Sequence, residues 1–353
     1  MESSFLVLTL AALVASSVAL ECVQIPDSQI KPQRSVVIPA GSSSPVVIPP
    51  NYDCTYKVSV PPMVYAHVTL QNGLKSNNDM IIVQDQQLTR TVVSSRSPAG
   101  MEFYVFPNTT TTFQVTTKSV NMQSSFRMYI HYVKMLNTTV TRMGNPDMRY
   151  FTLNNLQVNS YFTPQTLVTV DPNEKISLSV AVSGWDADHF DNYFVIDGDF
   201  ENPKYVYRMT RFVHQNYVST GNKLTVVGLD NSVSQSSVVF TPLSQALQYD
   251  SVTAIGTYFQ RNQLDINAKI GSKKRQAVNV IGMNDYTRVL SMDKSSDLNC
   301  SLKAVSTSVS GTPTEVYLDF MTVTDFPRNI THKSFTIVAE NCSASFQLVS
   351  LNF

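Results

Sequence analysis

Acidic side chains, the groups that hold hard cations, gather in one short stretch of this sequence. Asp186, Asp188 and Asp191 lie within a span of six residues, with His189 between them. Carboxylate oxygens that converge from loops are the ligands that Ca²⁺ prefers in proteins. The same stretch is more commonly an acidic turn that is solvated by water. Two interpretations, a cation site and a solvated turn, therefore stay open.

Catalytic signatures do not occur in the sequence. There is no H-E-x-x-H motif, no G-x-S-x-G motif and no Gly-rich phosphate loop. On the polar side of its strand, His67 is expected to be exposed, and only His189, among aspartates, is a candidate ligand. The five histidines are scattered along the chain: His67, His131, His189, His214 and His332. We therefore expect a protein that is not an enzyme.

Four cysteines, Cys22, Cys54, Cys300 and Cys342, could form disulfide bonds. An even number of cysteines behind an export signal is typical of disulfides in a secreted protein. Three pairings are possible, and closeness along the chain favours Cys22 with Cys54 and Cys300 with Cys342. Each bond would close a loop of roughly 30–45 residues and contribute about 3–4 kcal/mol.

Sequons for N-glycosylation occur at five asparagines. Such sites lie on the surface of secreted proteins. Two of the five directly precede a cysteine, so glycosylation there could compete with disulfide formation, and we expect the first two in the chain to be used most. The five are Asn108, Asn137, Asn299, Asn329 and Asn341.

The N-terminus has the pattern of a secretory signal peptide. Residues 5–20 are largely apolar, and small residues at Ser17 and Ala19 suit cleavage after Ala19. The alternative is a membrane anchor, because Glu2 stands where a basic residue is usual. The run is short for a bilayer span, and no later segment approaches the ~18 apolar residues that a span needs. We therefore expect residues 1–19 to be removed and the protein to be secreted, with no transmembrane segment.

Composition points to an all-β fold without nucleic-acid partners. The formal net charge is zero, so nothing indicates binding to nucleic acid or to an anionic membrane. Ser, Thr, Val and Asn are abundant, and short strand-like runs alternate with turn signals such as Asn72-Gly73 and Asp197-Gly198. This pattern is typical of tandem antiparallel β-sandwiches.

An internal repeat divides the chain. Val64, Ala66, Val68 and Leu70 alternate with polar residues, and the same alternation returns 112 residues later over 176–182. The offset also superposes 79–85 on 191–197, both of the form D-x-φ-x-φ-x-D. We therefore predict two homologous sandwich modules over 20–135 and 140–245. The second has no cysteine, and we expect it to fold alone.

The tail, residues 246–353, is as long as one module. It contains strand-like runs at 277–281, 314–323 and 335–338. Its Ser345-Phe346-Gln-Leu348 is similar to Ser125-Phe126-Arg-Met128 in the first module. The tail is β-rich, either a third sandwich or an appended sheet, and the sequence leaves both open.

A family resemblance rests on the first module. The stretch Val46-Val-Ile-Pro-Pro-Asn-Tyr-Asp-Cys54-Thr-Tyr-Lys-Val-Ser-Val-Pro61 is followed by Tyr65-Ala-His-Val-Thr-Leu70, by 79–85 and by Phe113-Gln-Val-Thr-Thr117. This pattern resembles the CUB-like domain of nematode secreted proteins. The resemblance implies a role in intestinal and innate responses to pathogens, and it supports pairing of Cys22 with Cys54.

The broader CUB resemblance also implies where calcium would bind. Some CUB domains hold Ca²⁺ with three acidic side chains, and two of these match Asp191 and Asp230 in the second module, with Asp186 or Asp188 as the third. At the 112-residue offset Asp230 corresponds to Lys118, whose ammonium would repel the ion or take its place. The resemblance therefore implies calcium in the second module and none in the first.

Two classes of function follow. The first is a soluble module that binds glycans or extracellular glycoproteins, including those of microbial surfaces. The second is a structural protein of the extracellular matrix or of the intestinal surface coat. Saturable binding by a monomer would distinguish the first class from the second.

Overall fold

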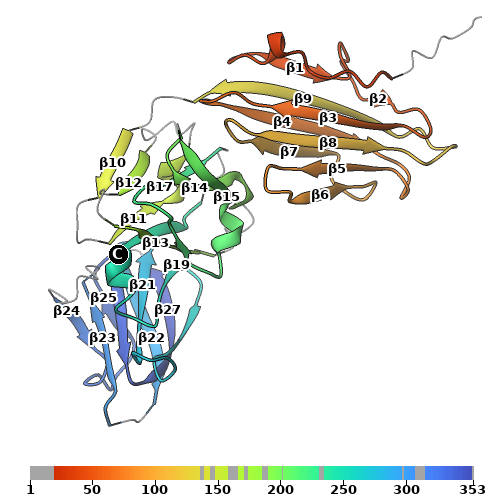
Figure 1. Cartoon of the computed structure of the whole chain (residues 1–353). Helices are drawn as coiled ribbons and strands as arrows, with labels where there is room; N and C mark the ends of the chain where they lie inside the picture. Colours follow the sequence, from red (N-terminus) through yellow and green to blue (C-terminus); the bar gives the residue numbers. More distant parts are fainter. Residues whose placement is uncertain are drawn as a thin grey trace, which may run out of the picture. The chain divides into compact units, whose positions relative to one another are not determined.

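The computed structural model describes residues 20–135, 139–143, 148–157, 166–170, 174–184, 190–200, 202–229, 234–295, 298–306 and 315–351. β-strands dominate these ranges (Figure 1). Their one α-helix is the four-residue α1 (Leu243–Ala246). It follows the strand that ends at Pro242 and precedes the strand that begins at Ser251. The predicted all-β fold of tandem antiparallel sandwiches is confirmed.

A five-stranded sheet and a four-stranded sheet form the first sandwich. One sheet has the order β1-β9-β4-β7, and the short β2 also pairs with β9; the other sheet has the order β3-β8-β5-β6. Burial alternates along the strands, as in β3, where Cys54, Tyr56 and Val58 face inward. The bounds are β1 (Ser35–Ile38), β2 (Val46–Val47), β3 (Asp53–Ser59), β4 (Val64–Gly73), β5 (Met80–Gln84), β6 (Arg90–Val93), β7 (Gly100–Val105), β8 (Thr110–Thr116) and β9 (Ser125–Lys134).

The middle part of the chain repeats this arrangement. Its sheets have the orders β11-β18-β13-β16 and β15-β14-β17, while β10 and β12 pair in parallel. The bounds are β10 (Thr139–Met143), β11 (Arg149–Thr152), β12 (Thr166–Val170), β13 (Ile176–Ala181), β14 (Tyr193–Gly198), β15 (Pro203–Arg208), β16 (Tyr217–Val218), β17 (Leu224–Gly228) and β18 (Ser237–Pro242).

The tail forms two sheets around a core of its own, so it is a sandwich rather than an appended sheet. Their orders are β20-β27-β22-β25 and β19-β21-β26-β23-β24, with β19 parallel to β21. The bounds are β19 (Ser251–Thr257), β20 (Asn262–Asn267), β21 (Arg275–Gly282), β22 (Tyr286–Lys294), β23 (Ser301–Val305), β24 (Val316–Asp319), β25 (Arg328–Ile330), β26 (Ser334–Glu340) and β27 (Ser343–Leu351).

All three sandwiches share one strand order. With β1 and β3 to β9 counted as first to eighth, the sheets of the first sandwich run first-eighth-third-sixth and second-seventh-fourth-fifth. The strands from β20 to β27 follow the same two orders, and those from β11 to β18 follow them except that β12 pairs with β10. A shared order of eight strands across the whole chain extends the repeat from two modules to three.

The chain divides into two compact units. The first consists of Met1–Ser59, Val68–Glu102 and Thr110–His131, and the second of Val60–His67, Phe103–Thr109 and Tyr132–Phe353.

Within the second unit the His67 ring stacks on Tyr104 with centroids 4.8 Å apart, and the side chain is only partly exposed. His67 is therefore less exposed than the sequence predicts, because a neighbouring aromatic ring covers one face of its imidazole.

The middle and last sandwiches share an apolar cluster inside the second unit. Ala181 and Val239 pack there with Val252 and Ala277. The amide of Gly256 donates to the carbonyl of Val182 at 3.0 Å, and a Cβ on Gly256 would lie 2.7 Å from that oxygen. Strand β13 is buried on both faces as a result, where the sequence predicts a strand buried on one face.

This cluster leads us to expect that 140–245 does not fold alone. The isolated fragment would expose the face that carries Ala181 and Val239 to water. Fragment 140–353 should unfold in one cooperative transition in urea, whereas 140–245 should bind a hydrophobic dye and show no sharp transition. Cooperative unfolding of 140–245 with no dye binding would show that the shared cluster is dispensable.

Candidate functional site

Three loops lie together at one end of the first sandwich. They connect β4 to β5 (74–79), β6 to β7 (94–99) and β8 to β9 (117–124), and we call them the loop end. Gly73, the last residue of β4, packs closely against Ser125, the first residue of β9. A Cβ added at Gly73 would lie 2.2 Å from the Ser125 hydroxyl oxygen. The strands thus place 20 loop residues on one rigid β scaffold.

A buried carboxylate, that of Asp79, organises the loop end. Its Oδ1 accepts hydrogen bonds from the backbone N–H groups of Lys118 (2.9 Å) and Ser119 (3.0 Å). Its Oδ2 accepts from the hydroxyls of Ser119 (2.5 Å) and Ser124 (2.6 Å). Both carboxylate oxygens are therefore satisfied by protein donors, and the side chain is 0% exposed.

Hydrogen bonding decides the charge state of this carboxyl. Burial favours the neutral acid and raises the pKa of Asp79, but the hydroxyl and amide donors together outweigh burial and hold the pKa below its ordinary value. The ionised form is thus the one that the fold stabilises. The carboxylate acts as a structural anion that closes the β8–β9 loop over β5.

The pKa of Asp79 predicts an acid-dependent loss of stability. Because the folded-state pKa lies below the unfolded value near 3.9, the stabilisation is complete above that value and is lost as the pH falls through the folded-state pKa. Asp79→Asn should be less stable than wild type at pH 7, and the difference should shrink below about pH 4. Urea unfolding across this range measures it, and a constant difference would contradict the assignment.

Further polar contacts tie the three loops to one another. The Ser124 hydroxyl accepts from the amide of Lys75 at 3.0 Å, which joins the first and third loops. The Ser95 hydroxyl donates to the Asn77 side chain at 3.0 Å, which joins the first and second. The Asn72 amide donates to the carbonyl of Ser94 at 2.9 Å. The loop end is therefore preorganised, which lowers the entropic cost of binding a partner.

The exposed groups of the loop end are basic and apolar. Lys75, Arg96 and Lys118 are exposed, and none of them forms an ion pair with a residue in the described ranges. Val120 and Met122 are 72% and 53% exposed. Asp79 is the sole acid in the three loop sequences, and it is buried.

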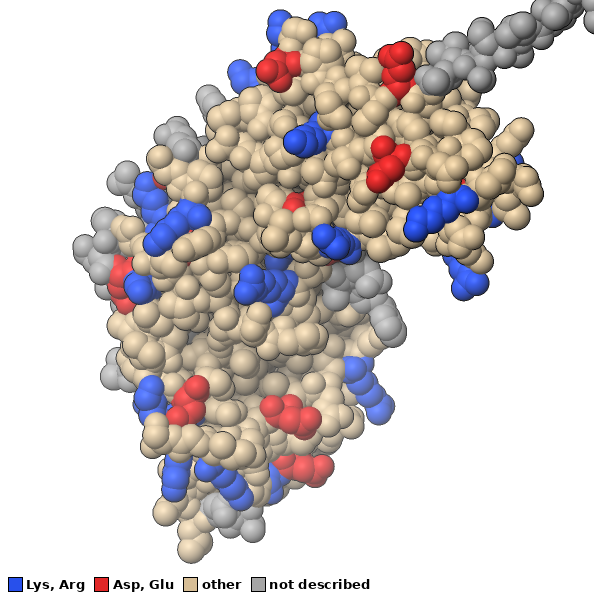
Figure 2. Space-filling view, turned by 45° about the vertical axis from the view of Figure 1, so that its right-hand side comes forward, with Lys and Arg blue, Asp and Glu red and all other residues tan. Residues whose placement is uncertain are grey.

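Charges of both signs occur on the face of the molecule that Figure 2 shows. In the view of Figure 2, Lys and Arg are interspersed with Asp and Glu, and uncharged surface separates them. No broad area of one sign covers the described residues on this face. On this face, charges of both signs are therefore present without a dominant sign.

The predicted calcium ligands fall mostly outside the described ranges. Asp186, Asp188 and Asp230 lie there, and only Asp191 is described. Asp191 is exposed, and its backbone carbonyl accepts from the Arg208 guanidinium at 2.7 Å. Where the structure is described, no group of three acidic, His or Cys side chains could hold a metal ion. The calcium site remains a prediction.

The ladder register changes the comparison between modules. Met80 pairs with Thr116, and the equivalent residue Asn192 lies opposite Leu229, since the amide of Leu229 donates to the carbonyl of Asn192. The offset between the two modules is therefore 112 residues from β5 to its equivalent β14, but 113 residues from β8 to its equivalent β17. With the second offset, Asp230 aligns with Thr117 instead of Lys118. In the first module, moreover, the backbone amide of Lys118 donates to the Asp79 carboxylate. The sequence predicts instead that the Lys118 ammonium repels the calcium ion or takes its place.

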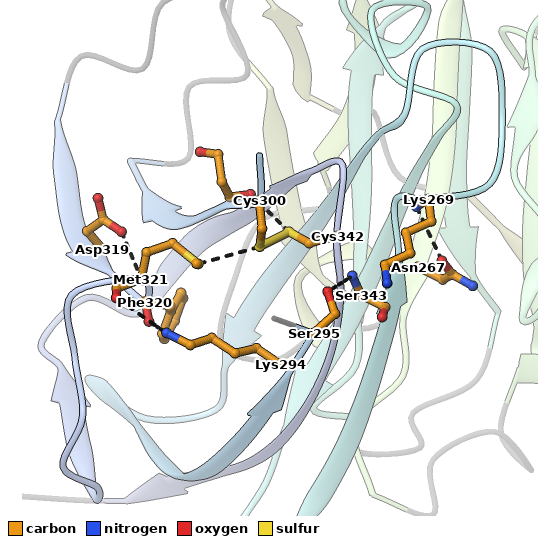
Figure 3. Close-up of a disulfide and its surroundings, with 11 residues drawn as sticks. Asn267, Lys269, Lys294, Ser295, Cys300, Asp319, Phe320, Met321, Cys342 and Ser343 are labelled. Carbon is orange, nitrogen blue, oxygen red and sulfur yellow. Dashed lines mark hydrogen bonds between the residues drawn. A yellow bond between two sulfur atoms is a disulfide. The ribbon is translucent and has the colours of Figure 1, made fainter. Parts of the chain in front are cut away.

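A disulfide occupies the matching place in the last sandwich. Asp79 and Ser124 directly precede β5 and β9, and Cys300 and Cys342 directly precede the equivalent strands β23 and β27. Figure 3 shows this bond with the Met321 thioether pointing at it, Sδ lying 3.4 Å from the Cys300 Sγ. A covalent link in one sandwich thus stands where a carboxylate–hydroxyl link stands in another.

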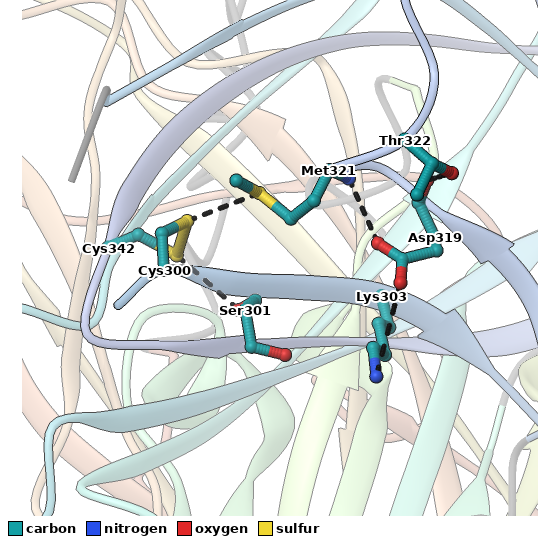
Figure 4. A network of polar contacts seen from close by, with 7 residues as sticks. All are labelled: Cys300, Ser301, Lys303, Asp319, Met321, Thr322 and Cys342. Carbon is teal, nitrogen blue, oxygen red and sulfur yellow. Dashed lines mark hydrogen bonds and ion pairs between the residues drawn. A yellow bond between two sulfur atoms is a disulfide. The ribbon is translucent and has the colours of Figure 1, made fainter. Parts of the chain in front are cut away.

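The surroundings of this disulfide hold the β24 turn in place. The Asp319 carboxylate accepts from the amide of Met321 at 3.0 Å and lies 4.0 Å from the Lys303 ammonium (Figure 4). Lys294 donates to the carbonyl of Phe320 at 2.9 Å. The other disulfide joins Cys22 to Cys54. Both bonds are the local pairs that closeness along the chain favours.

Four of the five predicted glycosylation sites are described, and all four are exposed. Asn108 and Asn341 have φ values of 57° and 55° in turns, and Asn329 lies on β25, where its side-chain oxygen accepts from Arg288 at 2.8 Å. Asn299 lies in the turn before Cys300, and Asn137 lies outside the described residues. Exposure is compatible with glycosylation at each described site.

Comparison with known proteins identifies the class of the first sandwich. Residues 17–136 match the family model described as CUB-like domain. No match was found among curated proteins. Residues 17–136 therefore match a CUB-like domain, and this match supports an extracellular protein-interaction module.

Solved structures show weak overall similarity. The CUB1-EGF-CUB2 domains of rat MASP-1 are 9% identical over 62% of this chain and 99% of that chain, with a TM-score of 0.24. The full extracellular region of zebrafish Gpr126/Adgrg6 is 12% identical over 93% of this chain and 52% of that chain, with a TM-score of 0.25. We draw no conclusion about function from these two. Among the described residues, no helix has the length and apolar character to span a membrane.

Proposed function

We propose that this is a secreted protein without catalytic activity that binds glycans or glycoproteins outside the cell and acts in innate or intestinal defence against pathogens. The signal-peptide pattern, two disulfides and exposed sequons support secretion. The CUB-like match supports recognition by a non-catalytic module. The defence role rests on the resemblance to nematode CUB-like proteins.

The loop end carries this proposal. A recognition surface needs exposed side chains on a rigid support, because ordering a loose loop on binding costs affinity. The hydrogen bonds of Asp79 supply the support. Lys118, Val120 and Met122 supply exposed groups that no described part of the fold requires.

Binding assays on the mature secreted protein test the proposal. The protein should bind glycans on an array or whole bacteria saturably and as a monomer. Lys118→Glu should weaken the binding, whereas Lys31→Glu, the same charge change at an exposed position outside the loop end, should not. Self-association with no saturable binding would favour the alternative, a structural protein of the matrix or surface coat.

Calcium binding by the second module is part of the proposal. With at most three carboxylates, from Asp191, Asp230 and either Asp186 or Asp188, the dissociation constant should be roughly 10⁻⁴–10⁻³ M. Millimolar calcium should therefore raise the melting temperature of the full chain modestly. Asp230→Ala should abolish the rise and Asp85→Ala in the first module should not. An unchanged wild-type melting temperature would mean that the acids form a solvated turn.

A further inference from the structure

The loop end carries two exposed apolar side chains, Val120 and Met122, which we call the apolar tips. It also carries exposed cations and no aromatic ring. Val120 and Met122 lie in the same loop as Lys118. The three loops contain no Phe, Tyr or Trp, so recognition there does not rely on stacking against an aromatic ring. Cations around apolar tips instead match the interface of an anionic bilayer, where cations meet headgroups and apolar groups enter the acyl boundary.

We propose that the loop end binds anionic phospholipid surfaces, with Val120 and Met122 entering the bilayer interface and Lys75, Arg96 and Lys118 contacting the headgroups. This inference rests on the proposed function in taking the loop end as the recognition surface. It names the surface as that of an anionic membrane, such as a bacterial one.

The placement of the cations follows from the contacts between loops. Lys75 is held beside the third loop because its backbone amide donates a hydrogen bond to the Ser124 hydroxyl. Arg96 is next to Ser95, whose hydroxyl binds Asn77 in the first loop. All three cations therefore lie on loops that are joined by hydrogen bonds, and Lys118 shares its loop with Val120 and Met122.

Acidic groups do not cancel this charge within the loops. The Asp79 carboxylate is buried and surrounded by four donors. Asp53, at the start of β3, is exposed, and its Oδ1 accepts from Gln114 at 3.0 Å and Thr116 at 3.5 Å. It precedes a strand and belongs to none of the three loops. The three loop sequences therefore carry exposed cations and no exposed acid.

Vesicle co-sedimentation of the mature full-length protein tests the inference. The probes are vesicles of phosphatidylglycerol mixed equally with phosphatidylcholine, and vesicles of phosphatidylcholine alone. We expect binding to the first and little to the second, weakened by high salt. Lys118→Ala should lower the partition coefficient about fivefold, and Lys75, Arg96 and Lys118 all replaced by Ala about a hundredfold.

Matched variants separate the tips from general hydrophobicity. Val120→Ser with Met122→Ser should reduce binding about tenfold. Leu88→Ser should have no effect, because Leu88 is 73% exposed but lies in the β5–β6 turn at the opposite end of β5. These positions are exposed, and melting curves check that each variant is folded.

The possible outcomes are distinguishable. No preference for phosphatidylglycerol, or equal binding by wild type and the loop variants, would overturn the lipid inference. Saturable binding to glycans or bacteria without vesicle binding would overturn it too, but would leave the proposed function standing. Loss of all three kinds of binding would contradict both.

Discussion

Asp79→Ala should lower the free energy of unfolding of the first sandwich by about 3–4 kcal/mol, the largest effect that we expect from one substitution. The change removes the acceptor of four hydrogen bonds and leaves two hydroxyls and two amides without it at a buried position. In calorimetry of the intact protein, the unfolding transition of the first sandwich should move to lower temperature.

Asp53→Ala is the matched control for this result. Asp53 also accepts side-chain hydrogen bonds at the start of a strand, but it is exposed, so water can replace it. We expect a change within about 1 kcal/mol. Equal effects of the two substitutions would mean that the buried carboxylate does not organise the loop end.

Replacing both Cys300 and Cys342 by alanine should destabilise the last sandwich by about 4 kcal/mol. The bond joins residues 42 apart, and its removal gives that much more freedom to the unfolded chain. Cys342 is also fully buried in the core of this sandwich, so its loss removes packing as well. Urea unfolding of fragment 140–353 measures the effect.

Met321→Leu is the control that separates the covalent bond from its contact. Leucine keeps an apolar side chain at this position but removes the sulfur that lies 3.4 Å from the Cys300 Sγ. We expect a change of less than about 1.5 kcal/mol, as for a volume-conserving apolar exchange. If the variant with both Cys300 and Cys342 replaced by alanine were as stable as wild type, another element would hold the starts of β23 and β27 together.

Strand positions and disulfide pairs could be predicted because they depend on local patterns. The alternation of Val64, Ala66, Val68 and Leu70 gives β4, and the pairs Cys22–Cys54 and Cys300–Cys342 are the close ones. The fold of the tail could not be predicted, because its repeat is visible in the strand order and hardly in the sequence. Only the sheet order shows that β20 to β27 follow the plan of the first sandwich.

Burial of β13 on both faces could not be predicted from its alternation. Ser177, Ser179 and Ala181 look like a solvent face, but they are small residues that allow a neighbouring sandwich to approach. Small size and solvent exposure give the same sequence pattern. The close contact at Gly256 is the one signal that could have indicated the neighbour.

Asp79 shows the same limit at the candidate site. In the sequence it is one of several aspartates near turns, and Ser119 and Ser124 lie 40 and 45 residues away. Only the fold brings these hydroxyls to the carboxylate. The one-residue difference in ladder register between the first two sandwiches also depends on pairing, so the constant offset placed Lys118 opposite Asp230.

Amide hydrogen exchange with and without bound bacteria or vesicles tests the central claim, that the loop end is the recognition surface. Residues 74–79, 94–99 and 117–124 should exchange more slowly in the bound state, while the β5–β6 turn at 85–89 should be unchanged. Protection confined to other parts of the chain, with 117–124 unaffected in a sample shown to be bound, would contradict the claim.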